Sequence, residues 1–179
     1  MFDARLPIFI LAAALAPAAH ATSATEFEQA VNGTLKRIYV DVPGAAGYLI
    51  AAKGILVFPR IHQADAGAGS ARGEGAMRVY GWTVDHYNAE GAAAGLQLDA
   101  GAKSVVIIFT DQKALDRFRQ KNEWQVGADG AVTMVDVGNA KPFETNAKTD
   151  QIVGFVFGRK GLMQGLKLDG AKFSRMQKK

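Results

Sequence analysis

Short apolar runs separated by glycine recur along most of this chain, and they constrain its fold more than any other feature. Four of these runs stand at residues 52–59, 73–77, 95–98 and 161–170. Glycine inside a strand usually marks a bulge, a tight bend or a close backbone approach, because it has no Cβ. Many such strands in succession predict a strongly twisted, partly closed antiparallel β-sheet rather than a helical bundle.

The segment before the sheet predicts two helices, which makes the expected fold class α+β. Thr25 and Glu28 form a capping-box pattern, which is typical of a helix start. Apolar residues then recur at helical spacing as far as Ile38, so this first helix is amphipathic. Pro43 can open a second helix that runs to Ala52, because proline suits the first helical position.

Residues 103–109 are mostly apolar and β-branched after Lys103 and Ser104, as a central strand of the sheet should be. Thr110 or Asp111 then caps a helix to about residue 121. This helix is expected to turn three apolar residues inward, Ala114, Leu115 and Phe118. Further strands are expected at residues 55–58, two within 67–80, 82–87 and 92–100 joined by a hairpin at 88–91, 130–137, 152–157, 162–168 and 171–173. The polar segment 141–150 is expected to form a mobile loop.

Residues 1–21 have the pattern of a secretory signal peptide. Arg5 supplies a positive charge, residues 6–15 are apolar, and residues 19–21 form an A-x-A cleavage site. The apolar run is shorter than the roughly 20 residues that span a bilayer, although an uncleaved anchor is the alternative interpretation. The chain has no cysteine, so it has neither disulfides nor a cysteine for lipid attachment. We therefore expect a soluble periplasmic or secreted protein, with residues 22–179 forming a single domain.

Positive charge is concentrated at the C-terminal end of the chain. The whole chain has a net charge of +4, and the last 21 residues hold seven Lys and Arg against Asp169 alone. A basic segment of this kind can contact an anionic membrane surface, or it can be a solubilising terminus. Nucleic acid is not an expected partner, because the chain is exported and the tail has no interleaved aromatic residues.

The sequence holds little that could support catalysis or a cofactor. After the predicted cleavage site there are two histidines, His62 and His86, at a spacing that does not fit a metal site. Asp85 beside His86 could form a triad with a serine, but neighbouring residues on a strand point to opposite faces. The Gly-x-Ser-x-Gly elbow of serine hydrolases is also absent. We expect no enzyme activity, no cofactor and no metal.

The order and wording of the four glycine-rich phrases resemble the SYLF domain family over about residues 51–173. That family includes lipid-binding modules of eukaryotic actin-patch proteins and many exported proteins of the bacterial envelope. The resemblance implies lipid recognition, which in eukaryotic relatives means phosphoinositide binding by basic residues. Because bacteria generally lack inositol lipids, phosphatidylglycerol, cardiolipin or another anionic amphiphile is the expected ligand. Actin regulation is not expected of an exported chain.

A lipid-binding protein needs apolar room for acyl chains beside fixed cations that meet phosphate. A curved, glycine-rich sheet can leave such room. The candidate cations are Lys36, Arg37, Lys53, Arg60, Arg72, Arg78, Arg159, Lys160, Lys172 and Arg175. The leading hypothesis is a non-catalytic, exported binding protein for phospholipid or another anionic amphiphile, with an anionic membrane surface as partner. The alternative is a periplasmic protein-interaction or structural module, whose protein partner the sequence does not identify.

Overall fold

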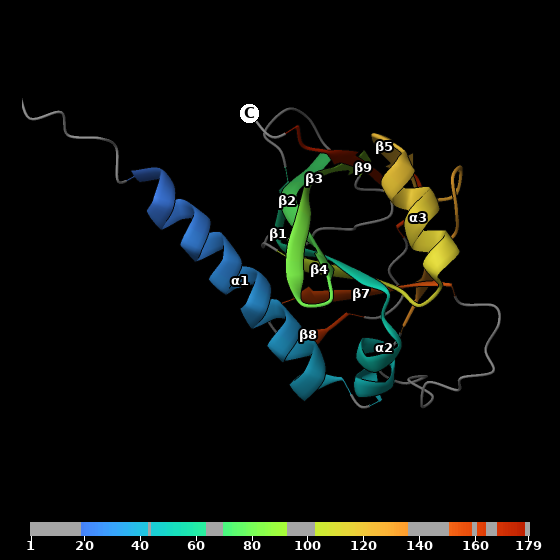
Figure 1. The fold of residues 1–179 in the computed structure, drawn as a ribbon, viewed down its shortest axis with the longest axis horizontal. Coiled ribbons are helices and arrows are strands. Elements are labelled where there is room, and N and C mark those ends of the chain that lie inside the picture. The colour runs from blue at the N-terminus through green and yellow to red at the C-terminus, as the bar shows by residue number, and fades with distance from the viewer. Residues whose placement is uncertain are drawn as a thin grey trace, which may run out of the picture.

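The computed structural model describes residues 19–42, 44–63, 70–92, 103–135, 151–158, 161–163 and 168–177. In chain order the elements are α1 (Ala19–Asp41), α2 (Ala45–Ala51), β1 (Gly54–Gln63), β2 (Ser70–Val79), β3 (Trp82–Ala92), β4 (Lys103–Phe109), α3 (Gln112–Gln120), β5 (Glu123–Gln125), β6 (Thr133–Met134), β7 (Ile152–Gly158), β8 (Gly161–Leu162) and β9 (Lys172–Arg175). Helices before the sheet and one after a central strand confirm the predicted α+β class (Figure 1).

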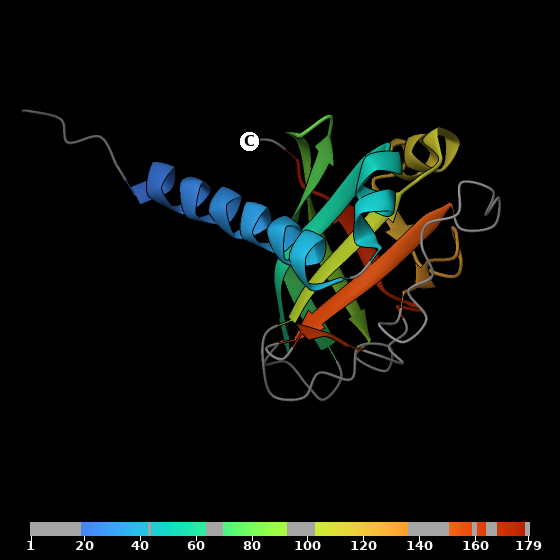
Figure 2. The same ribbon diagram turned by 90° about the horizontal axis from the view of Figure 1, so that it is seen from below.

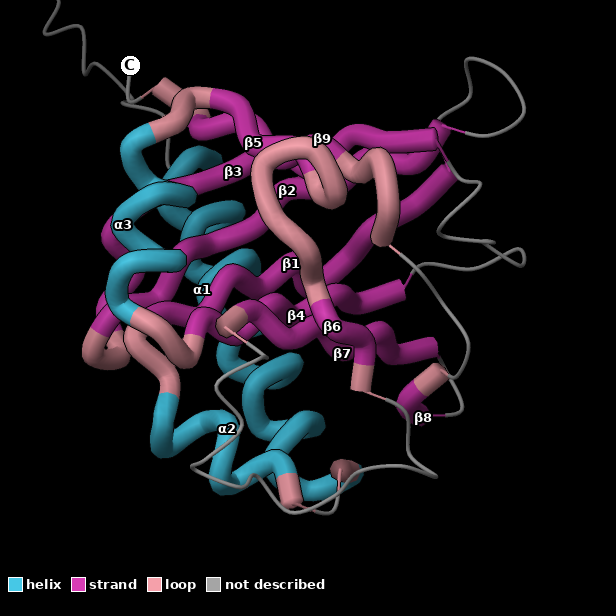
Figure 3. Tube along the Cα trace, turned by 90° about the vertical axis from the view of Figure 1, so that its right-hand side faces the viewer, coloured by secondary structure: helices cyan, strands magenta, loops and turns pink. Residues whose placement is uncertain are grey.

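The strands of the described residues form one strongly curled sheet. Their order is β5-β9-β3-β2-β1-β4-β7-β6, with β8 paired to β7, and Figure 3 shows them one above another. Neighbouring strands are antiparallel except β6 and β7. The register shifts where β1 carries Pro59 and again near Met77 of β2. Such bulges bend and twist a strand, and they accommodate a proline that cannot donate to the ladder. The twisted, partly closed sheet is therefore confirmed.

The inner face of the curled sheet encloses an aromatic core that α3 closes. The ring of Phe118 on α3 lies 4.9 Å from Phe109, 5.1 Å from Tyr87 and 5.4 Å from Trp124, between centroids. On the facing strands, Phe58 stacks on a ring of β9. All of these side chains are buried, so large rings fill the space that the curl creates.

A second core lies on the outer face of the sheet, under α1 and α2. Ile38 of α1, Ala45 of α2, Val57 of β1 and Val106 of β4 are buried within it. Because helices cover this face and the aromatic core covers the other, all seven residues of β4 are buried. This explains the continuous apolar run from Val105 to Phe109 in β4.

Only part of α1 lies against the sheet. Val31, Thr34 and Ile38 are buried at helical spacing, whereas Glu26 and Gln29 are exposed. In Figure 2 the N-terminal half of α1 points away from the strands. No helix among the described residues has the length and apolar character needed to cross a bilayer.

Several elements agree closely with the sequence prediction. Strand β4 and the strand at residues 152–157 lie where they were expected. Asp111 caps α3 by accepting a hydrogen bond from the backbone N–H of Ala114 at 2.8 Å. The three residues expected to face inward from α3 are all buried.

The predicted hairpin at residues 88–91 is wrong. Strand β3 is continuous, and it pairs with β2 along its length. The turn lies instead at Tyr80 and Gly81, whose φ angles are 51° and 83°. A two-residue turn with both residues in the left-handed region matches the twist of the flanking strands. Gly91 does not mark a turn but a close approach, because a Cβ there would lie 3.0 Å from the Cα of Ala171.

Other boundaries also differ from the prediction. Helix α1 begins at Ala19 and continues through the predicted cap at Thr25, because the alanine-rich residues before it also favour helix. Helix α2 follows Gly44, which has a left-handed φ of 81°. The described part of segment 67–80 holds one strand, and β1 is longer than predicted. Of the strand predicted at 130–137, the described residues up to 135 contain β6, and β5 was not predicted. The predicted loop at 141–150 and residues 93–100 lie outside the described residues.

Glycine at position 75 is expected to be required by packing, and glycine at position 33 is not. A Cβ at Gly75 would lie 2.5 Å from the ring of Phe58 and 2.9 Å from the carbonyl oxygen of Val57, whereas Gly33 on α1 has nothing within 4 Å. Gly75→Ala should therefore lower the free energy of unfolding by about 1–3 kcal/mol. Gly33→Ala should raise it by about 0.5–1 kcal/mol, because alanine favours helix. Urea unfolding measures both, and equal effects of the two substitutions would contradict this account.

Candidate functional site

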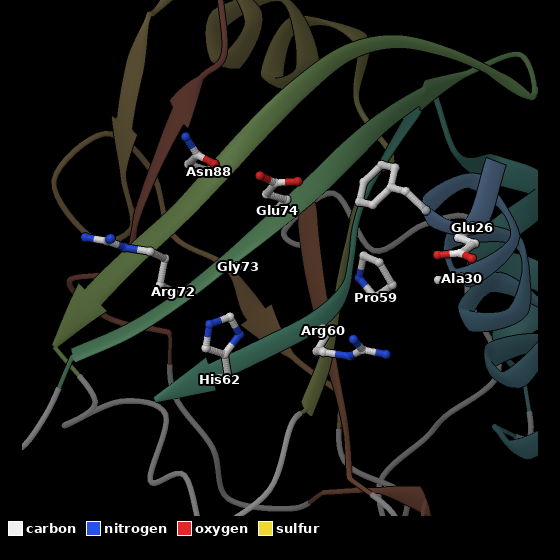
Figure 4. A pocket seen from close by; sticks show the side chains of 10 residues that line it. Glu26, Ala30, Pro59, Arg60, His62, Arg72, Gly73, Glu74 and Asn88 are labelled. Atoms are coloured by element: carbon white, nitrogen blue, oxygen red, sulfur yellow. The ribbon is translucent and has the colours of Figure 1, made fainter. Parts of the chain in front are cut away.

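A groove of about 450 Å³ lies between the N-terminal half of α1 and the outer face of the sheet. We call it the first groove (Figure 4). Its lining residues come from α1, β1, β2 and β3, and they are Glu26, Phe27, Ala30, Pro59, Arg60, His62, Arg72, Gly73, Glu74 and Asn88. The groove exists because α1 leaves the sheet at this point, so nothing described covers the strands beneath.

The outer face of the sheet changes from apolar to polar at the bulge in β1. Before the bulge, Val57 is buried under the helices. After it, Arg60 and His62 are exposed on the same side of the strand and line the groove. The first part of β1 therefore packs against the helices with apolar side chains, and its second part lines the groove with charged and polar ones.

The first groove has an apolar end and a mixed charged wall. Phe27 and Ala30 on α1 and Pro59 on β1 supply its apolar lining. Glu26 lies beside Ala30 at the same end, and the side chain of Arg60 extends toward α1 (Figure 4). Within the described part of the chain, Arg60 has no hydrogen-bonded or ionic partner. Arg72 pairs with Glu90 at 3.5 Å, but both side chains are more than half exposed, so this pair is weak. As far as the described residues show, the guanidinium of Arg60 is thus the one in this groove without a partner, and it can meet an anion.

A second groove, of about 370 Å³, lies between α1, α2 and the turn that joins β2 to β3. Its lining residues are Asn32, Leu35, Leu49, Ala52, Lys53, Gly54, Ile55, Arg78, Tyr80 and Gly81. The side chain of Lys53 is exposed here and has no hydrogen-bonded or ionic partner among the described residues. The surface is mostly apolar with a cationic edge.

Arg78 stands between the two grooves and ties α1 to the sheet. Its guanidinium donates to Glu28 at 2.5 Å and to Asn32 at 2.8 Å, both on α1, and to the carbonyl of Gly81 at 2.9 Å. Glu28 also accepts a hydrogen bond from Thr83 at 2.8 Å. The side chain of Arg78 is only 12% exposed, so this predicted lipid contact is committed to holding the protein together.

Arg175, another predicted lipid contact, is likewise engaged inside the protein. It donates to the hydroxyl of Tyr87 at 3.3 Å and to the carbonyl of Arg119, and Asp85 lies 3.9 Å away. The hydrogen bond to Tyr87 raises the pKa of Arg175. Burial raises the pKa of Tyr87 above its usual value. Both groups therefore keep their ordinary protonation in a polar contact that closes one end of the inner core.

The other predicted cations that the structure describes do not gather at one place. Arg37 pairs with Asp41 at 3.7 Å and donates to the carbonyl of Gly158 at 2.9 Å. Lys172 pairs with Glu123 at 3.2 Å near one edge of the sheet. Lys36 is exposed on α1 with no partner in the described part of the chain. Arg159 and Lys160 lie outside the described residues.

The inner space expected for acyl chains is not found in the described part of the sheet. The cavity there, bounded by Ile61, Ala71, Val105 and Phe173 among others, has a volume of about 10 Å³. This is roughly the space for one water molecule. Among the described residues, aromatic side chains fill the volume that the glycines leave. The first and second grooves on the outer face offer more space. The sequence analysis did not identify Phe27 and Ala30 as residues of a binding site.

Replacing Arg78 is expected to loosen α1, whereas replacing Arg72 on the same strand is not. Arg78→Met would leave the Glu28 carboxylate without its cation and should lower the free energy of unfolding by about 1–3 kcal/mol. Arg72→Met removes only an exposed pair and should cost less than about 1 kcal/mol. Urea unfolding and amide hydrogen exchange in α1 measure both effects. If the amide hydrogens of α1 exchange at the wild-type rate in the Arg78 variant, Arg78 does not hold α1 on the sheet.

Comparison with known proteins agrees with the resemblance seen in the sequence. Residues 90–179 match the Ysc84 family, described as Las17-binding protein actin regulator, which is the SYLF domain family. The match begins at the end of β3 and covers half of the chain, while α1, α2, β1 and β2 precede it. No curated protein matches the chain. The matched half and the curled antiparallel sheet together lead to one conclusion: this protein belongs to the Ysc84 (SYLF domain) family.

Proposed function

We propose that this protein is an exported, non-catalytic binding protein for phospholipid or another anionic amphiphile at the bacterial envelope. The first groove is the proposed site. The observation that carries the proposal is the position of Arg60, a guanidinium without a partner in the described chain, beside the apolar side chains of Phe27, Ala30 and Pro59. An amphiphile needs this combination, because its head group carries charge and its tail must leave water.

The size and surroundings of the groove suit part of a lipid molecule. Pockets for small molecules typically measure about 300–1,000 Å³, and the first groove falls within that range at about 450 Å³. Arg72 and His62 add donors at the far end, while Glu26 and Glu74 disfavour additional negative charge. A head group with a single phosphate therefore fits this charge pattern better than one with several.

The proposed export rests on the signal-like pattern of residues 1–21. Processing after Ala21 would leave a chain that starts at Thr22 and would shorten α1 by three residues at its free end. The intact mass of the protein recovered from its cellular compartment should therefore correspond to residues 22–179. A mass that includes the first 21 residues would contradict the proposed processing.

Lipid binding in the first groove should depend on Arg60. A short-chain phosphatidylglycerol, used below the concentration at which it forms micelles, should bind the purified protein in a calorimetric titration. Arg60→Glu should weaken this binding about tenfold or more, because a charge-assisted hydrogen bond is lost and a repulsive charge takes its place. Lys113→Glu, at an exposed position of α3 outside the groove, changes the net charge equally and should have no effect.

A second pair of variants tests the apolar end of the same groove. Ala30→Phe should occupy the space beside Phe27 and reduce the affinity, whereas Gln29→Phe, at an exposed neighbouring position of α1 outside the groove, should not. Phosphatidylcholine of the same chain length should bind more weakly than phosphatidylglycerol. If neither lipid binds, or if the groove variants and their controls bind alike, the proposed function fails.

The alternative function is a protein-interaction module without a lipid ligand. The family's description, a Las17-binding actin regulator, names a protein partner for members of this family. A pull-down that captures a defined partner, survives delipidation and high salt, and is accompanied by negative lipid titrations would favour this alternative.

A further inference from the structure

Large apolar side chains that remain exposed are concentrated at one end of the described structure. They are Tyr39, Val40, Ile50, Tyr80 and Trp82, with Met176 elsewhere. The first five belong to the last turns of α1, to α2 and to the turn between β2 and β3, which all lie in the lower half of Figure 1. These three elements jointly line the second groove. Tyr80 and Trp82 are 92% and 77% exposed, so the turn presents two aromatic rings to solvent.

The backbone of this turn is an unusual place for a tyrosine. Tyr80 has a φ of 51° at the first central position of the turn, where Asn, Asp or Gly is usual. A bulky side chain in the left-handed region is strained. Tyr80 is almost fully exposed, so core packing does not explain its presence. Strain that packing does not explain points to a functional role for the side chain.

The turn is also held in place. Arg78 donates to the carbonyl of Gly81 at 2.9 Å and reaches Glu28 and Asn32 of α1 with the same guanidinium. The two aromatic side chains are therefore carried on a turn that is anchored to a helix. A preformed contact loses less conformational entropy on binding than a flexible one does.

The charged side chains that line the second groove are positive, and the carboxylate of Asp41 at the end of α1 is paired with Arg37. In the described chain the lining of the second groove includes Lys53 and Arg78 and no carboxylate. Glu28, which lies against Arg78, is occupied by that arginine and by Thr83. Lys36 lies on the same face of α1 as Asn32 and Tyr39 by helical spacing. Lys36 and Lys53 have no partners among the described residues, so both are free to meet anions.

We propose that this end of the protein docks on the surface of an anionic phospholipid bilayer. Tyr80 and Trp82 enter the head-group region, where tyrosine and tryptophan rings are favoured. Lys36 and Lys53 contact lipid phosphates, as basic side chains near anionic membranes do. This surface is separate from the first groove. It rests on the proposed function only in that a bilayer is present where the protein works.

A bilayer fits this surface better than a protein partner does. The aromatic side chains stand on an exposed turn rather than in a pocket, and cations flank them without acidic residues in the groove lining. Tyrosine and tryptophan each combine an apolar ring with a polar group, which suits the boundary between acyl chains and water. A fluid, anionic surface can meet all three elements at once without a matching shape.

Vesicle binding by the processed protein tests this proposal. Vesicles of phosphatidylcholine with and without phosphatidylglycerol are mixed with the protein at low salt, and co-flotation and tryptophan emission are measured. We expect co-flotation with the anionic vesicles and a blue shift of the emission, which brominated lipids quench. The signal reports on Trp82, because the second tryptophan, Trp124, is buried in the inner core and 3% exposed.

Three variants define the contribution of the turn. Tyr80→Asn and Trp82→Ser should each lower the vesicle partition coefficient about tenfold. Each substitution removes one aromatic side chain that would otherwise be buried in the head-group region. Met176→Ser removes an exposed apolar side chain elsewhere and should leave partition unchanged. Tyr80→Asn should fold at least as well as the wild type, because Asn-Gly suits this turn. Loss of binding in that variant therefore does not reflect unfolding.

The outcomes separate this proposal from the first groove. Tyr80→Asn and Trp82→Ser should still bind monomeric short-chain phosphatidylglycerol, which tests the groove and not the bilayer contact. An emission spectrum of Trp82 that vesicles do not change would overturn the docking proposal. So would flotation of the Tyr80→Asn, Trp82→Ser double variant at the wild-type level. A blue shift with a purified protein partner but none with vesicles would also overturn it, in favour of a protein interface.

Discussion

Burial of both faces of strand β4 is the constraint on which the other features of the structure depend. A strand that is apolar on both faces must be covered twice. The aromatic core beneath α3 covers one face, and α1 and α2 cover the other. Because the inner cover consists of large rings, the inside of the curled sheet is filled. The two grooves that the described residues form therefore lie on the outer face of the sheet and at its edge.

The outer cover is incomplete, and both grooves arise where it ends. Helix α1 lies on the sheet only while the strands beneath present apolar side chains, and the bulge at Pro59 replaces these with Arg60 and His62. Beyond that point the helix leaves the strands and the first groove opens. The second groove lies between α1, α2 and the turn at Tyr80. Both grooves are thus consequences of how one amphipathic helix crosses one bulged sheet.

The sequence predicted the elements whose signals are local, and it failed where tertiary contacts decide. The cap at Asp111 and the continuous apolar run of β4 are encoded in neighbouring residues, and both were identified. Gly91 was taken as part of a turn, but it is needed because Ala171 of a distant segment approaches it. Tertiary contacts also set the surroundings of two candidate cations: chain position does not show that Arg78 and Arg175 face carboxylate and carbonyl groups elsewhere in the fold. Arg60 differs from them only in lacking such a partner in the described structure.

Arg78 gives a physical link between the two surfaces. Its guanidinium contacts α1, which forms one wall of the first groove, and the carbonyl of Gly81, which shapes the turn beside the second. Its hydrogen bonds to Glu28 and to Gly81 cannot be optimised independently, because one planar group makes both. The same guanidinium therefore fixes the turn and Glu28 together, and Glu28 lies within one helical turn of the groove residues Phe27 and Ala30.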